Sequence, residues 1–159
     1  WGQNMVSNYP TNVEGTIVIA PGDYNVVPFA DYVNSAIECV VEDNYIVDIR
    51  GDGGDAELMR GHMESYDDPD VFATSHFGWG LNPNGEFYNM AIHDRKPDET
   101  GVSASEGRVW SGNMLWSTGP NTHVDRYAPC HYDIAQKDCS VYLDGTAVVE
   151  NGDVVEDVV

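Results

Sequence analysis

Short apolar runs separated by turn residues make up the first third of this chain. Residues 16–20 (TIVIA) predict a buried strand, which the turn residues at 21–23 (PGD) end. Residues 36–41 and 45–49 predict two more strands, and the connection at 42–44 (EDN) fits a hairpin. The first third is therefore predicted to be antiparallel sheet.

The next segment has the period of a helix. Apolar and aromatic positions recur there at spacings of three and four, as on one helical face: Leu58, Met59, His62, Met63 and Tyr66. Asp52 or Asp55 is expected to cap this helix, and Asp68-Pro69 to stop it. Because His62 lies on the stripe, packing is a simpler interpretation of it than metal binding. The capping-box pattern at 103–106 (SASE) predicts a second, short helix.

Strand patterns return in the second half. Residues 71–76 predict a strand that leads into a glycine-rich turn at 78–85, where a pocket is expected because glycines let the backbone approach a bound group. Residues 113–118 predict another strand, and 139–155 predict strands joined by Asp-Gly and Asn-Gly turns. The predicted fold class is α+β: a mainly antiparallel sheet, curved or partly barrel-like, with one or two helices.

Size and composition favour one soluble domain spanning residues 1–159. The length suits a single core, 42% of the residues are apolar, and no apolar run approaches the ~20 residues of a membrane span. The first residues have neither the basic region nor the apolar core of a signal peptide. They also lack an initiator Met, which fits a processed or partial chain.

Charge excludes one class of partner. Seven basic and 27 acidic residues give a net charge of −20 spread along the chain, which would repel nucleic acid. A calcium-binding surface is the weaker alternative, because Asp52-Gly53-Gly54-Asp55 and 151–153 (NGD) read as turns and complete no EF-hand loop.

The cysteines point to a reducing compartment. Cys39, Cys130 and Cys139 are odd in number and form no Cys-x-x-Cys pair, so a reduced, cytoplasmic setting is the simpler interpretation. Cys130 adjoins His131 and is a candidate nucleophile, but a packed, small apolar residue is the expected role where no second base is in view.

The strongest candidate chemistry lies at Pro129 to Ile134. His131 and Asp133 alternate in a strand-like context, so both side chains face one side. An imidazole and a carboxylate can form two corners of a 2-His-1-carboxylate iron site, and His76, beside the predicted strand, is the candidate third corner. A hydrogen-bonded core histidine remains the alternative, and a second His-x-Asp pair occurs at His123 and Asp125.

Six short motifs follow one another in an order that resembles a known family. They are APGD at 20–23, SHFGWGLNP at 75–83, STGPNT at 117–122, CHYDI at 130–134, YLDG at 142–145 and GDVV at 152–155. Nearly end to end, the chain resembles the C-terminal half of the 2,5-dihydroxypyridine 5,6-dioxygenase family, ring-opening enzymes of nicotinate degradation. That family is related in fold to aminopeptidase T-like enzymes, which share His-x-Asp but have a glutamate where this chain has His76.

The resemblance implies a site and a reaction. His76, His131 and Asp133 would be the ligands of Fe(II), a set suited to O₂ chemistry, and Ser117 a substrate-side residue. The implied reaction is an extradiol-type opening of 2,5-dihydroxypyridine, or a similar hydroxylated N-heteroaromatic, to an N-formylmaleamate-type product. His123 or Asp125 is expected to donate or accept a hydrogen bond near the ligands.

The resemblance also implies a partner, and two other functions remain open. Family members have an N-terminal domain that this chain lacks, so we expect a homo-oligomer or an association with an N-terminal-half polypeptide. The residues expected at that surface are aromatic: Trp1, Tyr9, Trp79, Trp110 and Trp116. The alternatives are an aminopeptidase-like hydrolase using Zn²⁺ or Co²⁺, and a non-catalytic binding or assembly domain whose histidines are structural.

Overall fold

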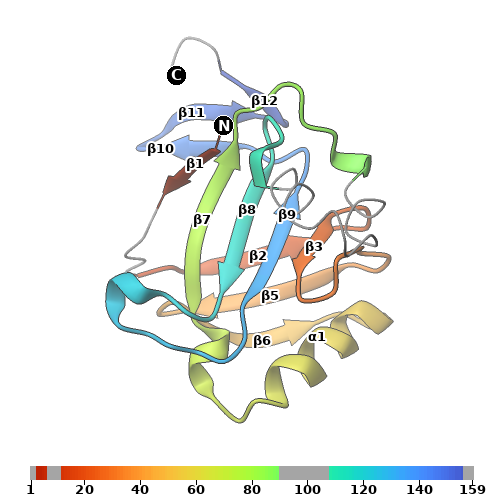
Figure 1. The fold of residues 1–159 in the computed structure, drawn as a ribbon, viewed down its shortest axis with the longest axis vertical. Helices are drawn as coiled ribbons and strands as arrows, with labels where there is room; N and C mark the ends of the chain where they lie inside the picture. The colour runs from red at the N-terminus through yellow and green to blue at the C-terminus, as the bar shows by residue number, and fades with distance from the viewer. Residues whose placement is uncertain (1–2, 7–11, 90–107, 156–159) are drawn as a thin grey trace, which may run out of the picture.

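Three antiparallel sheets and one α-helix make up the computed structural model, which describes residues 3–6, 12–89 and 108–155 (Figure 1). The largest sheet has six strands in the order β1 (Gln3–Val6), β7 (Thr74–Gly80), β8 (Met114–Thr118), β9 (Tyr132–Gln136), β3 (Tyr24–Val27) and β4 (Asp31–Tyr32). The second is β2 (Gly15–Ile19), β5 (Ile37–Glu42) and β6 (Tyr45–Arg50). The third is β10 (Val141–Leu143), β11 (Thr146–Glu150) and β12 (Asp153–Val154). The helices are α1 (Gly54–Glu64) and the 3₁₀ turns η1 (Pro69–Phe72), η2 (Phe87–Asn89) and η4 (Thr122–Val124).

The main core lies between the first two sheets. Figure 1 shows β2, β5 and β6 crossing the lower part of the long strands β7, β8 and β9, with α1 beside β6. The alternating residues of β5 face inward, and from the large sheet Trp116, Tyr132 and Ile134 meet them. The helix adds Ala56, Met59 and Met63, all fully buried. One face of the large sheet thus packs on the second sheet and the helix. Its other face also has a core, formed by five buried residues: Tyr24, Val26, Phe87, Leu115 and Ala135.

Several predicted elements are confirmed. The strand at 16–20 corresponds to β2, and the predicted hairpin corresponds to β5 and β6, which pair antiparallel. Residues 113–118 contain β8, and the C-terminal strands β10, β11 and β12 turn at Asp144-Gly145 and Asn151-Gly152. Strands β1, β3 and β4 were not predicted.

The predicted glycine-rich turn at 78–85 is wrong in its first part. Gly78, Trp79 and Gly80 continue β7, and Val71 and Phe72 lie in η1 instead of a strand. The absence of a side chain at Gly80 serves packing against the protein itself: a Cβ there would lie 1.8 Å from the carbonyl oxygen of Trp110. No ligand is needed to explain this glycine.

The helix differs from its prediction at both ends. Its N-cap is Gly53, which has no side chain to form a capping hydrogen bond. The predicted cap Asp55 lies in the first turn instead, where its carboxylate accepts hydrogen bonds from the backbone N of Ser35 at 2.7 Å and from the Ser35 Oγ at 2.6 Å. It ends at Glu64, before Asp68-Pro69. Leu58 is 51% exposed and does not belong to the buried stripe. The predicted second helix at 103–106 lies outside the described residues.

Two further expectations are corrected. The three sheets of the described ranges do not close into a barrel. Trp79 and Trp116 are buried in cores, so they do not line an exposed interface, whereas Trp110 is half-buried and Trp1 and Tyr9 lie outside the described residues. The relation to the aminopeptidase T-like fold stays a prediction.

Among the residues that the structure describes, no helix has the length and apolar character needed to cross a membrane.

Candidate metal centre

A row of three residues crosses the large sheet from strand to strand. His76 of β7 pairs with Ser117 of β8, which pairs in turn with Asp133 of β9. His131 precedes Asp133 by two positions and so shares its face. Because Trp116 and Ile134 point into the main core, this row lies on the opposite face, which we call the site face. Pairing between β7 and β8 is irregular between Thr74 and His76, a bulge of the kind found beside functional sites.

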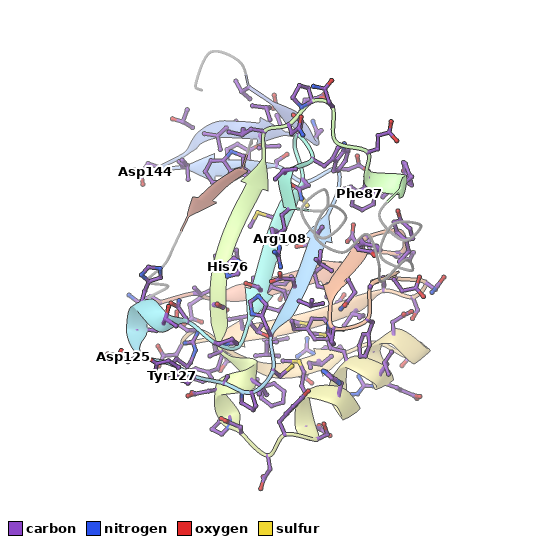
Figure 2. All side chains as sticks on the ribbon, in the orientation of Figure 1. His76, Phe87, Arg108, Asp125, Tyr127 and Asp144 are labelled. Atoms are coloured by element: carbon purple, nitrogen blue, oxygen red, sulfur yellow. The ribbon has the colours of Figure 1, made fainter. Side chains whose placement is uncertain are left out.

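The three residues predicted as metal ligands meet on the site face. Oδ1 of Asp133 lies 2.8 Å from Nε2 of His131 and 3.8 Å from Nε2 of His76. One ligand atom from each residue lies within 4.8 Å of the others. The two imidazole rings stack with their centroids 5.5 Å apart. Figure 2 shows His76 and Arg108 over the middle of the large sheet.

Contacts of two serine hydroxyls with Nδ1 fix the orientation of the His76 ring. Its Nδ1 lies 2.7 Å from the Ser117 hydroxyl, and that hydroxyl donates to the His76 carbonyl at 3.3 Å. The Ser75 hydroxyl, 3.3 Å from the same Nδ1, donates to the Pro120 carbonyl. With the ring hydrogen on Nδ1, that hydrogen is donated to the Ser117 hydroxyl and the Nε2 lone pair faces Asp133. Burial lowers the pKa of His76 more than Asp133 raises it, so the ring is held neutral.

Asp133 is a fully buried carboxylate with one ionic partner that the sequence did not indicate. Its Oδ2 accepts a hydrogen bond from Nη2 of Arg108 at 2.8 Å. Burial by itself raises the pKa of Asp133, but His131 and Arg108 outweigh burial and hold that pKa below its usual value. No local pattern marks Arg108; the only available signal was its rarity, as one of seven basic residues in a strongly acidic chain.

The donor atoms fit a bound cation. Oδ1 of Asp133 is buried with Nε2 of His131 2.8 Å away, while Nδ1 of His131 is buried without a hydrogen-bond partner among the described residues. A carboxylate oxygen and the lone pair of a neutral imidazole repel each other at 2.8 Å unless a proton or a cation lies between them. Two imidazole nitrogens and one carboxylate oxygen are the donors of the facial triad. The residues present therefore suit a divalent transition metal.

A pocket of about 300 Å³ opens beside the two histidines. Its lining comprises Ser75, His76, Pro120, Asn121, Thr122, His123 and His131. Asn121 holds the η4 wall in place, since its side chain accepts from His123 N and donates to the Ser75 carbonyl. Arg126 adds hydrogen bonds to the Gly119 and Thr74 carbonyls. The pocket thus lies beyond Ser75, not at the glycine-rich end of β7 where it was expected.

The residues that were expected to assist the ligands differ in their distance from the pocket. Ser117 is fully buried behind His76 and is not among the lining residues of the pocket, so its expected substrate-side role stays a prediction. His123 lines the pocket, whereas Asp125 is exposed at the end of η4, on an outer loop away from His76 (Figure 2). A hydrogen bond from Asp125 to the ligands is therefore not part of this structure.

The two remaining candidates belong to the main core. His62 packs edge-to-face against Phe29 and Tyr66, in agreement with a packing role. Cys130, 3.5 Å from Nε2 of His62, is buried, and burial raises the pKa of its thiol. A raised thiol pKa disfavours the nucleophilic thiolate, so Cys130 is a packed residue as expected.

Similar proteins share one description. The model of a protein family described as 2,5-dihydroxypyridine 5,6-dioxygenase (NicX) matches residues 1–156. A curated 2,5-dihydroxypyridine 5,6-dioxygenase from Pseudomonas putida KT2440 is 40% identical over 159 residues, covering 98% of this chain and 44% of that protein. A solved structure of 2,5-dihydroxypyridine dioxygenase from Pseudomonas putida KT2440 matches with a TM-score of 0.83 and 41% identity, over 93% of this chain and 42% of that one. The chain therefore spans less than half the length of these relatives.

Proposed function

The chain belongs to the 2,5-dihydroxypyridine 5,6-dioxygenase family, and on this premise we propose that residues 1–159 form the metal-binding domain of a ring-cleaving dioxygenase. The observation that carries the proposal is the convergence of His76, His131 and Asp133, with the buried Oδ1 of Asp133 2.8 Å from Nε2 of His131. These three residues are the proposed metal ligands.

The proposed metal is Fe(II). Two imidazoles and one carboxylate leave several positions open on a non-haem iron, as a reaction between two bound substrates requires. When bound, iron supplies the activation of O₂ and of the hydroxylated ring. The proposed substrate is 2,5-dihydroxypyridine or a similar hydroxylated N-heteroaromatic, opened in extradiol fashion to an N-formylmaleamate-type product. The names of the relatives and the pocket, at the lower end of the range for small-molecule sites, support a single-ring substrate.

The protein's own groups prepare the site for this chemistry. The lowered pKa of His76 favours the neutral ring at neutral pH, and with the ring hydrogen on Nδ1, donated to Ser117, the Nε2 lone pair is available to a metal. The lowered pKa of Asp133 keeps its carboxylate ionised at neutral pH. Thr122 and His123 supply polar groups on the pocket wall that can orient the ring oxygens of the substrate.

Anaerobic titration with Fe(II) tests the proposal. The wild-type chain is expected to bind one Fe(II), and His131→Ala to lose it. His93→Ala is the control, because it removes a histidine that is not a proposed ligand. Equal iron binding by wild type and His131→Ala would sink the proposal.

The same donor set leaves one competing chemistry to test. Zn²⁺ is also held by sets of histidine and carboxylate, with water as the nucleophile of a hydrolase. Zn²⁺-dependent turnover of amino-acid amides, with no O₂ uptake on hydroxypyridines, would favour that reaction. Family membership makes the dioxygenase the better-supported choice.

A further inference from the structure

We propose that Arg108 is a positioning residue for the metal centre, which holds one oxygen of Asp133 so that only the other is presented to the metal. The inference rests on the proposed function, because it concerns the same three ligands. Arg108 Nη2 lies 2.8 Å from Oδ2 of Asp133, and Oδ1 faces His131 and His76. The two oxygens of one buried carboxylate therefore have different surroundings.

The backbone that follows Arg108 is hydrogen-bonded to the segment just after β7, the strand that carries His76. Beyond the end of β7, Asn82 N donates to the Val109 carbonyl at 2.8 Å, and Ser111 N donates to the Asn82 carbonyl at 3.0 Å. The Trp110 ring packs on Phe87 with centroids 4.9 Å apart. These contacts hold the backbone that follows Arg108, from which its side chain reaches Oδ2 of Asp133.

A carboxylate can bind a metal through one oxygen or through both. A charge-assisted hydrogen bond from a guanidinium is strong enough to keep Oδ2 occupied. Asp133 then contributes one donor atom, and the three ligands together contribute three. Without Arg108, Oδ2 would also be able to bind the metal. Asp133 would then occupy a second coordination position, one that a substrate would otherwise use.

A purely structural role for Arg108 makes a different prediction. If the guanidinium only compensates a buried negative charge, its loss lowers stability and leaves the surroundings of a bound metal unchanged. If it positions Asp133, its loss changes both the metal affinity and the spectrum of the bound metal. The second readout separates the two roles.

The experiment uses the 159-residue chain and Co²⁺, whose visible absorption reports the number and arrangement of its ligands. Arg108→Met is expected to change the affinity for Co²⁺ by about tenfold, the usual size of the effect of losing a group that orients a ligand, and to give a changed spectrum. Arg108→Lys, which keeps a charged donor, is expected to restore part of both. Arg50→Met is the matched control, because Arg50 pairs with Asp48 at 2.7 Å on the exposed surface and carries the same charge.

Each outcome of this experiment either supports or overturns the inference. Wild-type affinity and spectrum in Arg108→Met would overturn the inference, while Co²⁺ binding by the wild type would leave the proposed metal site standing. Absence of metal binding by the wild type itself would overturn the proposed function and this inference with it. If thermal unfolding of the metal-free chain shows that Arg108→Met does not fold, Arg108→Gln replaces it and is judged by the same two outcomes.

Discussion

The hydroxyl of Ser117 lies 2.7 Å from Nδ1 of His76, and the two residues stand opposite each other in the register of β7 and β8. The Ser117 hydroxyl can accept the hydrogen of His76 Nδ1, which leaves the Nε2 lone pair facing Asp133. It also leaves space on the site face for the imidazole to reach toward Asp133. Through this contact a buried serine becomes part of the candidate metal centre without being one of its proposed ligands.

Ser117→Ala should weaken metal binding about tenfold. The change leaves Nδ1 of His76 with the Ser75 hydroxyl at 3.3 Å as its nearest partner, so the ring loses its fixed orientation. Calorimetric titration with Co²⁺ measures the effect. Ser140→Ala is the control, since it removes a serine hydroxyl that accepts from Asn151 N in an exposed turn. Equal affinities for the two variants would contradict the assigned role.

The metal-free chain should lose stability as the pH falls from 7 to 5. Burial lowers the pKa of His76, so the folded chain binds fewer protons at this site than the unfolded chain. The resulting stability is fully present above the unfolded pKa of about 6.5 and is lost as the pH falls through the lower folded pKa. Urea unfolding with chelator at several pH values should show a flatter pH dependence for His76→Gln. An unchanged slope in that variant would count against this explanation.

Two neighbouring helix residues should respond differently to truncation. Met59 is fully buried and its sulfur lies 3.9 Å from Sγ of Cys39, so Met59→Ala should cost about 2–5 kcal/mol in the free energy of unfolding. Leu58 is 51% exposed, so Leu58→Ala should stay within roughly 0.5 kcal/mol of wild type. Urea unfolding of the two variants measures both values. A comparable loss in Leu58→Ala would show that the helix packs by a different face.

Alanine at Gly119 should destabilise the fold, whereas alanine at Gly61 should not. Gly119 has φ +97°, and a Cβ there would lie 1.9 Å from the carbonyl oxygen of Cys130. The cost of Gly119→Ala should exceed about 1 kcal/mol. A Cβ at Gly61 meets nothing within 4 Å, and alanine is the better helix former by about 1 kcal/mol. Thermal unfolding of both variants should therefore shift the melting temperature in opposite directions.

The chain by itself should bind metal but cleave no ring. It spans 44% of a relative's length, and we expect residues outside these 159, on the same or on another polypeptide, to contribute part of the substrate site. Light scattering after size exclusion, at high and low salt, tests for association. O₂ uptake on 2,5-dihydroxypyridine with added Fe(II) tests activity. A monomer at both salt concentrations that opens the ring would show that no partner is needed.

The sequence by itself determined the local part of this result. Period-two alternation predicted that His131 and Asp133 share one face, and in the structure Nε2 of His131 lies 2.8 Å from Oδ1 of Asp133. Turn residues between apolar runs likewise predicted the hairpin of β5 and β6 and the C-terminal strands. The motif order also indicated the family, because motifs report ancestry without reference to three-dimensional contacts.

The tertiary structure alone decided how the site is completed. His76 joins His131 and Asp133 only through the register of β7, β8 and β9, and a slip of one residue would turn His76 to the core face. Side-chain pattern could not reveal that Gly80 makes room for the Trp110 carbonyl, because such approach depends on two segments far apart in the chain. The same holds for Arg108, whose contact with Asp133 depends on packing beyond the end of β7 and not on any local period.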